Sequence, residues 1–139
     1  MDTSLFIKTY ESLTKDNCEI IKDIYHPDVE FEDPIRKTFG LSELLPYLSD
    51  SYQNVHYCRF QITDSIEQEN QACVRWLMRL SHPKLSQGRE LTVHGCSVLH
   101  YQDELIIYHR DYFDLGEMVY QNIPILGSVV AMIRQRLKG

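Results

Sequence analysis

Two aspartates in strand-like segments are the residues of this chain best suited to acid–base chemistry. Asp33 closes the alternating stretch 29–33, immediately before Pro34, and Asp111 lies within the apolar stretch 105–113. If both carboxyls face one cavity, desolvation and like charge favour the neutral form of one, while the other stays ionised. One aspartate would then act as the acid and the other as the base.

The two-residue period of a strand predicts which neighbours accompany these aspartates. Phe31 falls on the face of Asp33, and His109 and Phe113 fall on the face of Asp111. His109 is therefore placed to shuttle protons beside Asp111, although a lone strand histidine is also a common structural residue.

Each aspartate also has a purely structural interpretation. Asp33 precedes a proline, where aspartate commonly forms an Asx turn. Asp111 could form an ion pair with Arg75 or Arg110 that only fixes strand packing. Both interpretations stay open at the level of sequence.

The elements that would position these residues follow from hydrophobic periodicity. Helical spacing predicts a first helix over about 5–13, capped by Thr3 or Ser4, and a short second helix over 16–25. A third helix is expected over 41–48, with Pro46 causing a kink or a late start.

Strand-like segments alternate with short polar breaks through the rest of the chain. They cover residues 28–33, 56–66, 71–80, 90–101 and 105–113, and a helical segment interrupted at Pro124 follows from residue 115. This order predicts one α+β domain over residues 1–139, with a strongly curved, mostly antiparallel sheet wrapped around the N-terminal helices and a C-terminal helical segment. Such a cone-shaped sheet encloses a cavity, which is the default ligand site.

Composition and charge exclude several other classes of function. The 14 basic and 20 acidic residues give a net charge of −6, which disfavours nucleic acid and anionic membrane surfaces as partners. The 4 cysteines are isolated and the histidines form no ligand set, so we expect neither a metal nor a cofactor. The longest mostly apolar run, 123–133, is too short to span a bilayer, and no secretory signal opens the chain. We therefore expect a soluble cytoplasmic protein without an integral membrane segment.

Two motifs resemble a known superfamily. The segment YHPDVEFEDP at 25–34 is similar to the part of ketosteroid isomerases that carries the proton-shuttling aspartate. The segment HRDYFD at 109–114 resembles the last strand of limonene-epoxide hydrolases, whose aspartate activates water. Both belong to the nuclear-transport-factor-like, or SnoaL-like, superfamily of cystatin-like α+β barrels, and with the element order the resemblance covers nearly the whole chain. It implies a homodimer formed through the sheet.

The resemblance to the hydrolases implies roles for residues of the third long strand. An arginine at the position of Arg75 would lie between Asp33 and Asp111 and offset their repulsion. The hydrolase aspartate that protonates the epoxide is replaced here by Leu77, and the water-orienting tyrosine and asparagine fall on Phe31 and Asp33. The hydrolase proton relay is therefore incomplete.

The resemblance to the isomerases implies an oxyanion site. In the isomerases, a tyrosine and a neutral aspartic acid together stabilise the enolate oxygen. Tyr10 lies close to the position of that tyrosine if one residue is deleted between the helices, and Ser97 takes the place of the aspartic acid. A serine hydroxyl still donates a hydrogen bond.

These observations predict a small-molecule pocket protein acting on an apolar molecule with a polar oxygen, such as a steroid, polyketide, terpenoid or lipid fragment. As an enzyme it would be a cofactor-independent isomerase, cyclase or hydrolase. The expected catalytic residues are Asp33, Asp111, His109, Arg75 and Tyr10, and the expected substrate-binding residues are Phe31, Ser97, Phe113 and Leu77. The alternative is a non-catalytic ligand-binding or dimerisation module. Separately, the C-terminal segment from residue 115 either closes the cavity as a lid or binds another protein or a lipid surface.

Overall fold

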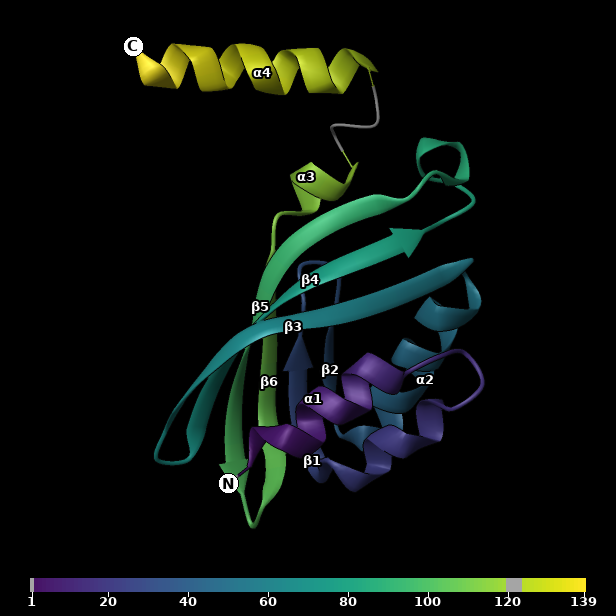
Figure 1. The fold of residues 1–139 in the computed structure, drawn as a ribbon, viewed down its shortest axis with the longest axis vertical. Coiled ribbons are helices and arrows are strands. Elements are labelled where there is room, and N and C mark those ends of the chain that lie inside the picture. Colours follow the sequence, from purple (N-terminus) through teal and green to yellow (C-terminus); the bar gives the residue numbers. More distant parts are fainter. Residues whose placement is uncertain (1, 120–123) are drawn as a thin grey trace.

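Six strands form one curved, mixed sheet in the computed structural model, which describes residues 2–119 and 124–139 (Figure 1). The strands are β1 (Tyr25–Glu32), β2 (Lys37–Phe39), β3 (Tyr57–Gln68), β4 (Gln71–Ser81), β5 (Leu91–Gln102) and β6 (Leu105–Phe113). Their order is β2-β1-β6-β5-β4-β3, and every neighbouring pair is antiparallel except β1 and β6. The predicted α+β class and the curved, mostly antiparallel sheet are confirmed, although the sheet stays open, with β2 and β3 as its edges.

The N-terminal helices lie against the concave side of this sheet (Figure 1). They are α1 (Thr3–Ser12), the 3₁₀ helix η1 (Cys18–Asp23) and α2 (Leu41–Gln53). The carboxylate of Asp2 caps α1 by accepting the backbone N–H of Ser4 at 2.8 Å, so the predicted caps Thr3 and Ser4 are wrong. Pro46 lies inside α2, which begins at Leu41 and therefore does not start late.

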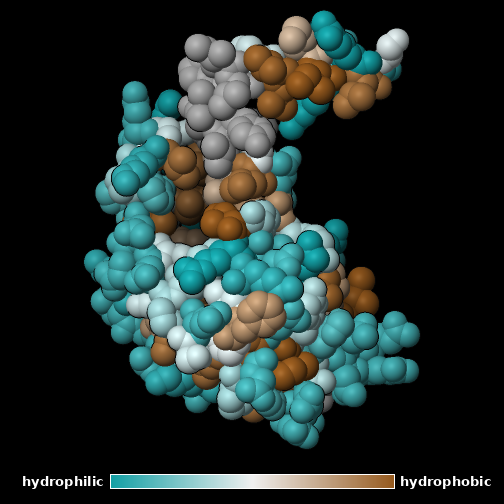
Figure 2. Space-filling model, turned by 180° about the vertical axis from the view of Figure 1, so that it is seen from behind, coloured by the Kyte–Doolittle hydropathy of each residue, from teal (hydrophilic) through white to brown (hydrophobic). Residues whose placement is uncertain are grey.

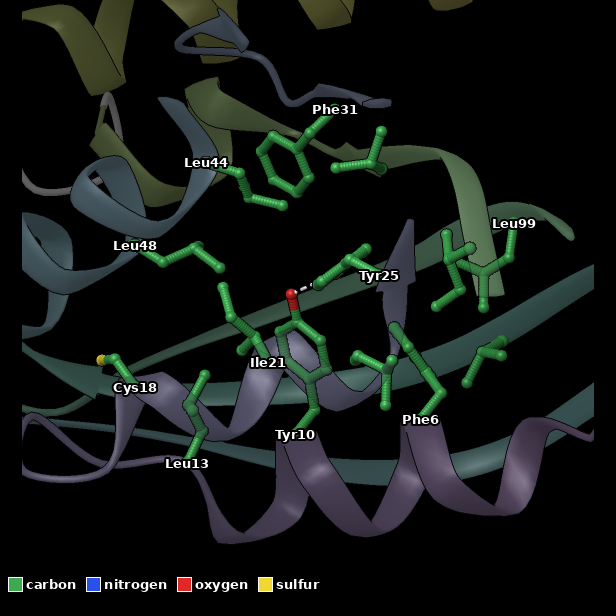
Figure 3. Close-up of a cluster of buried hydrophobic side chains, with 14 of the residues drawn as sticks. Phe6, Tyr10, Leu13, Cys18, Ile21, Tyr25, Phe31, Leu44, Leu48 and Leu99 are labelled. Atoms are coloured by element: carbon green, nitrogen blue, oxygen red, sulfur yellow. Dashed lines mark hydrogen bonds between the residues drawn. The ribbon is translucent and has the colours of Figure 1, made fainter. Parts of the chain in front are cut away.

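The apolar faces of these helices and of β1 and β6 form the main hydrophobic core (Figure 3). Ile21, Val29 and Leu44 are completely buried in it. Burial of large aliphatic side chains contributes about 1.5–3 kcal/mol each, which fixes the helices on the sheet. A second core cluster lies further along β4 and β5 and is formed by Trp76, Met78, Leu80, Val93 and Met118.

Strand β4 alternates strictly between the two faces of the sheet. The side chains that point to the concave side and are buried are those of Ala72, Val74, Trp76, Met78 and Leu80. Gly95 of β5 is the register partner of Trp76, and a Cβ at this position would lie 2.3 Å from the indole ring. Because Gly95 has no side chain, the indole ring of Trp76 can pack directly against β5.

Two further helices follow the sheet, as the sequence predicts. Helix α3 (Leu115–Val119) places Met118 in the second core cluster, and α4 (Pro124–Lys138) begins at the predicted break at Pro124. None of the side chains described for α4 is buried. Among the described residues, no helix has both the length and the apolar character needed to cross a bilayer.

Candidate active site

A cavity of about 450 Å³ opens on the concave side of the sheet, between α2, β4, β6 and α3. Figure 2 shows a hollow lined by hydrophobic residues, with hydrophilic residues along part of its rim. Both predicted aspartates, Asp33 and Asp111, lie on its wall. The aromatic residues that line it are Tyr10, Phe31, Tyr47, Tyr52, Phe60, Trp76 and Phe113.

The carboxylate of Asp111 is anchored through only one of its oxygens. Oδ1 accepts hydrogen bonds from His109 Nε2 at 2.6 Å and from Ser97 Oγ at 2.5 Å, since an ionised carboxylate can only accept. No hydrogen bond from a described residue reaches Oδ2, and the side chain is 14% exposed. Asp111, which lines the cavity, therefore keeps one carboxylate oxygen free of hydrogen bonds from described residues.

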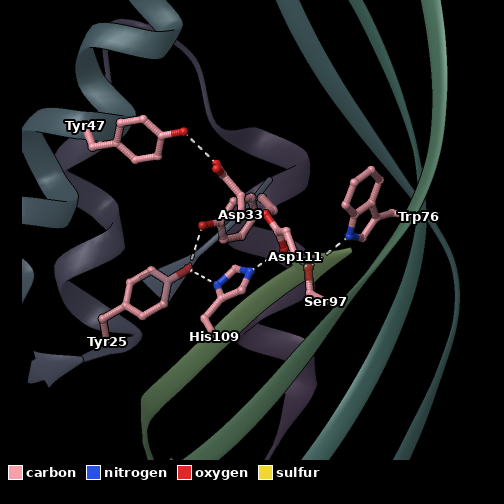
Figure 4. Close-up of polar contacts among 8 residues, drawn as sticks. Tyr25, Asp33, Tyr47, Trp76, Ser97, His109 and Asp111 are labelled. Atoms are coloured by element: carbon pink, nitrogen blue, oxygen red, sulfur yellow. Dashed lines mark hydrogen bonds and ion pairs between the residues drawn. The ribbon is translucent and has the colours of Figure 1, made fainter. Parts of the chain in front are cut away.

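A buried chain of hydrogen bonds extends from His109 away from the carboxylate (Figure 4). With the Nε2 proton directed at Asp111, a neutral imidazole must accept at Nδ1, so Tyr25 donates to it at 2.6 Å. Tyr25 in turn accepts from Tyr10, with 2.6 Å between the two hydroxyl oxygens (Figure 3). All the protons of this chain point toward Asp111.

A second chain holds Ser97. Trp76 Nε1 donates to Ser97 Oγ at 2.9 Å, and this leaves the serine hydroxyl proton for Asp111. Ser97 is buried and pairs with Asp111 across β5 and β6. The rotamer of Asp111 is thus set by neighbours on both sides.

Asp33 combines the two roles that the sequence left open. Its Oδ1 accepts the backbone N–H groups of Ile35 and Arg36, both at 2.8 Å, in an Asx-type turn. Its Oδ2 accepts from the Tyr47 hydroxyl at 2.6 Å and faces the cavity (Figure 4). Asp33 is therefore a turn residue whose second oxygen belongs to the cavity wall.

Burial keeps the tyrosine hydroxyls of the site protonated. Desolvation raises the pKa of Tyr10, and the negative charge of Asp111 adds to the effect. Burial also raises the pKa of Tyr25, as does the neighbouring Tyr10. The pKa of Tyr47 is raised by burial and by its hydrogen bond to Asp33. These hydroxyls consequently act as hydrogen-bond donors at neutral pH.

The raised pKa values of Tyr10 and Tyr25 predict a loss of stability in alkali. Above pH about 10 the unfolded tyrosines release protons that the folded state retains, so the free energy of unfolding falls as pH rises. Each residue contributes up to about 1.4 kcal/mol per pH unit. Urea unfolding at pH 9 and pH 11 is expected to differ by about 2–3 kcal/mol from this pair alone. In Tyr10→Phe, the loss of unfolding free energy that Tyr10 and Tyr25 cause between pH 9 and pH 11 should be roughly halved. Equal stability of the wild-type protein at the two pH values would contradict the raised pKa values of these tyrosines.

Two predicted site residues lie elsewhere. Arg75 points to the convex face and forms a bidentate pair with Asp64, at 2.6 and 2.5 Å, so the expected guanidinium between Asp33 and Asp111 is not there. Leu77 also points to the convex face, like Arg75, and does not line the cavity. The physical reason is the alternation of β4, which directs Trp76 inward and its neighbours outward.

The structure brings the other predicted residues together. Phe31 and Phe113 line the cavity, Ser97 and His109 hold Asp111, and Tyr10 ends the buried chain. Sequence reasoning missed Tyr25, Tyr47, Tyr52 and Trp76. Only Trp76 had a usable signal, namely its place in the apolar alternation of residues 72–80. Within residues 2–119 and 124–139, no three potential ligands are grouped in a way that could hold a metal ion.

The comparison with protein families identifies the chain. Residues 6–109 match the model of the SnoaL-like domain. The chain belongs to the SnoaL-like family. No curated protein matches its sequence.

Solved structures of this SnoaL-like chain's fold come from several bacteria. An NTF2-like protein of unknown function from Burkholderia pseudomallei is similar with a TM-score of 0.76 at 17% identity, over 88% of this chain and 99% of that one. A hypothetical protein with a ketosteroid isomerase-like fold from Catenulispora acidiphila, solved in complex with trimethylamine, has a TM-score of 0.76 at 12% identity, over 88% and 94%. An LEH-like epoxide hydrolase from M. tuberculosis has a TM-score of 0.69 at 16% identity, over 93% and 92%. At these identities the likeness establishes the fold.

Proposed function

We propose that this SnoaL-like protein is a cofactor-independent acid–base enzyme, in which Asp111 transfers a proton to or from an apolar, oxygen-bearing molecule held in the cavity. The observation that carries the proposal is that Asp111 lines an apolar cavity with its Oδ1 fixed by His109 and Ser97 and its Oδ2 without a hydrogen bond from a described residue. A general base must lie within hydrogen-bond reach of the proton that it takes, and a carboxylate oxygen without a hydrogen bond is free to approach it.

The chemistry that this geometry supports is proton transfer next to a carbonyl. Asp111 Oδ2 takes a proton from the carbon beside the carbonyl, and the electron pair moves onto the carbonyl oxygen. The same carboxyl then returns the proton to that carbon or, in the dienolate of an unsaturated ketone, to the γ carbon, which isomerises the double bond. Donors near that oxygen would stabilise the enolate. Tyr52 is the donor that suits this role, because its hydroxyl is buried in the cavity wall with only the weakly bonding Cys58 thiol as a neighbour. The hydroxyl of Tyr10 is already committed to Tyr25.

Epoxide hydrolysis fits the site less well than isomerisation. Opening an epoxide requires an acid beside the base, and the position expected to supply one, Leu77, is an outward-facing aliphatic residue. Asp33 has its two oxygens engaged by two backbone N–H groups and by Tyr47. We therefore assign Asp33 and Tyr47 to binding and positioning, and proton transfer to Asp111.

Isotope incorporation tests this function and does not require an identified substrate. The protein is incubated with a panel of apolar ketones and enones in D₂O, and deuterium at carbon is measured by mass spectrometry. We expect protein-dependent exchange beside the carbonyl of at least one compound, because the carboxyl exchanges its proton with solvent between turnovers. Binding of panel members without exchange in any of them would favour the alternative function, a non-catalytic ligand-binding module.

A non-catalytic role has its own supporting observation. The hydroxyls of Tyr10, Tyr25 and Tyr47 all donate within the protein, which leaves few donors for a developing oxyanion. The homodimer and the cytoplasmic location stay predictions. Exposed Ile66 and Tyr112 on the sheet, 70% and 47% accessible, are consistent with a dimer contact.

A further inference from the structure

The cavity holds two carboxylates and no strongly basic side chain. Asp33 and Asp111 both line it, and none of its described lining residues is a lysine or arginine. The lining histidine, His82, accepts the backbone N–H of Lys84 at its Nδ1, 3.0 Å away. The segment 119–127 contains no lysine or arginine either. Burial is the main cause of the raised pKa of Tyr10 and of Tyr47, and the charges of both aspartates add to it, while Arg36 acts in the opposite direction on Tyr47.

Three arginines near the cavity have partners of their own, and one of them, Arg110, lines a neighbouring opening together with Asp33 and Asp111. Arg110 forms an ion pair with Glu32 at 3.1 Å, and Arg75 is paired with Asp64 on the convex face. Arg36 is exposed, with its guanidinium carbon 5.4 Å from the centroid of the Tyr47 ring. None of these three arginines lines the cavity.

Aromatic rings flank the carboxylate of Asp33. The rings of Phe31 and Tyr47 have their centroids 6.0 Å apart and are inclined by 57°, and the Tyr47 hydroxyl is bound to Asp33 Oδ2. This oxygen accepts one described hydrogen bond and keeps a lone pair for another donor. Two ring walls beside a carboxylate are the arrangement in which proteins hold an alkylammonium group, because the ring quadrupoles and the carboxylate attract the same charge.

We propose that the molecule bound in the cavity carries a positive charge, and that its protonated amine lies against Asp33 and the rings of Phe31 and Tyr47. The inference rests on the proposed function only in taking this cavity as the ligand site. Tyr52 also lines the cavity, and its buried hydroxyl has only the Cys58 thiol beside it, so it is the donor left for an acceptor oxygen of the ligand. The ligand class is therefore an apolar amine that also carries an oxygen, with Asp111 left free for the proton transfer.

Three probes that differ only in charge test this proposal. Adamantan-1-ylmethylamine, adamantan-1-ylmethanol and adamantane-1-carboxylate share one apolar body and are respectively cationic, neutral and anionic at pH 7. Trp76 is the only tryptophan of the chain and lines the cavity, so its fluorescence reports occupancy directly. We expect the amine to bind about tenfold more tightly than the alcohol, and the carboxylate to bind most weakly.

Matched variants locate the charge effect. Asp33→Asn keeps an oxygen for the turn and is expected to reduce the preference for the amine to about twofold or less, while the Kd of the alcohol changes little. Phe31→Leu should reduce the same preference to about threefold by removing one ring. Asp28→Asn, at a side chain 86% exposed on β1, is the control and should leave the ratio unchanged.

The outcomes separate this proposal from the proposed function. An alcohol that binds as tightly as the amine, or a preference that survives Asp33→Asn, would overturn the positive charge and leave the acid–base function standing. Failure of all three probes to change Trp76 fluorescence or to bind by calorimetry would contradict the cavity as a ligand site, and with it both proposals.

Discussion

Asp111→Asn is expected to lower the rate of proton exchange by about 10²–10⁴-fold, the usual contribution of a positioned general base. The amide oxygen of asparagine can still accept from His109 and Ser97, which occupy Oδ1 in the wild-type protein. The basic oxygen that faces the cavity is replaced by an NH₂ group, which cannot accept a proton. The free energy of unfolding should change by less than about 1 kcal/mol, because both anchoring hydrogen bonds are retained.

The measurement is the deuterium incorporation rate of the compound identified in the ketone panel, accompanied by urea unfolding. Asp64→Asn is the matched control, because it removes a carboxylate from the convex face, where Asp64 is paired with Arg75. Its exchange rate should equal that of the wild-type protein. If Asp111→Asn exchanges at the wild-type rate while remaining folded, Asp111 is not the base.

His109→Ala should be the most destabilising single change at the site, with a loss of about 3–5 kcal/mol, as when one partner of a buried pair is removed. The imidazole is completely buried and bridges Tyr25 to Asp111. Its removal leaves the Tyr25 hydroxyl without its acceptor, takes a donor from Asp111, and opens a cavity beside Phe31 and Phe6, whose rings pack against it.

Urea unfolding at neutral pH measures this effect. His94→Ala is the control, since His94 is exposed on β5 of the same sheet and should cost less than about 0.5 kcal/mol. A loss below about 1 kcal/mol for His109→Ala would show that the chain of hydrogen bonds does not hold the site together.

The sequence predicted the parts of the fold that depend on local periodicity. The predicted strand 105–113 coincides with β6, and alternation along it correctly placed His109, Asp111 and Phe113 on one face. The predicted helix near the N-terminus is α1, and the polar breaks separate the strands where expected. These features depend on residues close together in the chain, where period and turn chemistry decide the structure.

The features that were missed depend on contacts between distant parts of the chain. The parallel pairing of β1 with β6 joins residues about eighty positions apart, and the Tyr25–His109 bond follows from it. Strand β2 has only 3 residues, too few for a period to show. Arg75 and Leu77 were placed in the site by resemblance across one strand, where an error of one position turns a side chain to the other face. The chain's own alternation, with Val74, Trp76 and Met78 inward, indicates the correct phase.

The central claim is that the free oxygen of Asp111 faces a cavity that admits a ligand. A crystal structure of the protein soaked with an apolar ketone that undergoes exchange tests it most directly. We expect the ketone in the recess beside Trp76, with its exchanging carbon next to Asp111 Oδ2 and with His109 and Ser97 still bound to Oδ1. A ketone bound elsewhere, or a carboxylate of Asp111 turned away from the recess and paired with an arginine, would contradict the account.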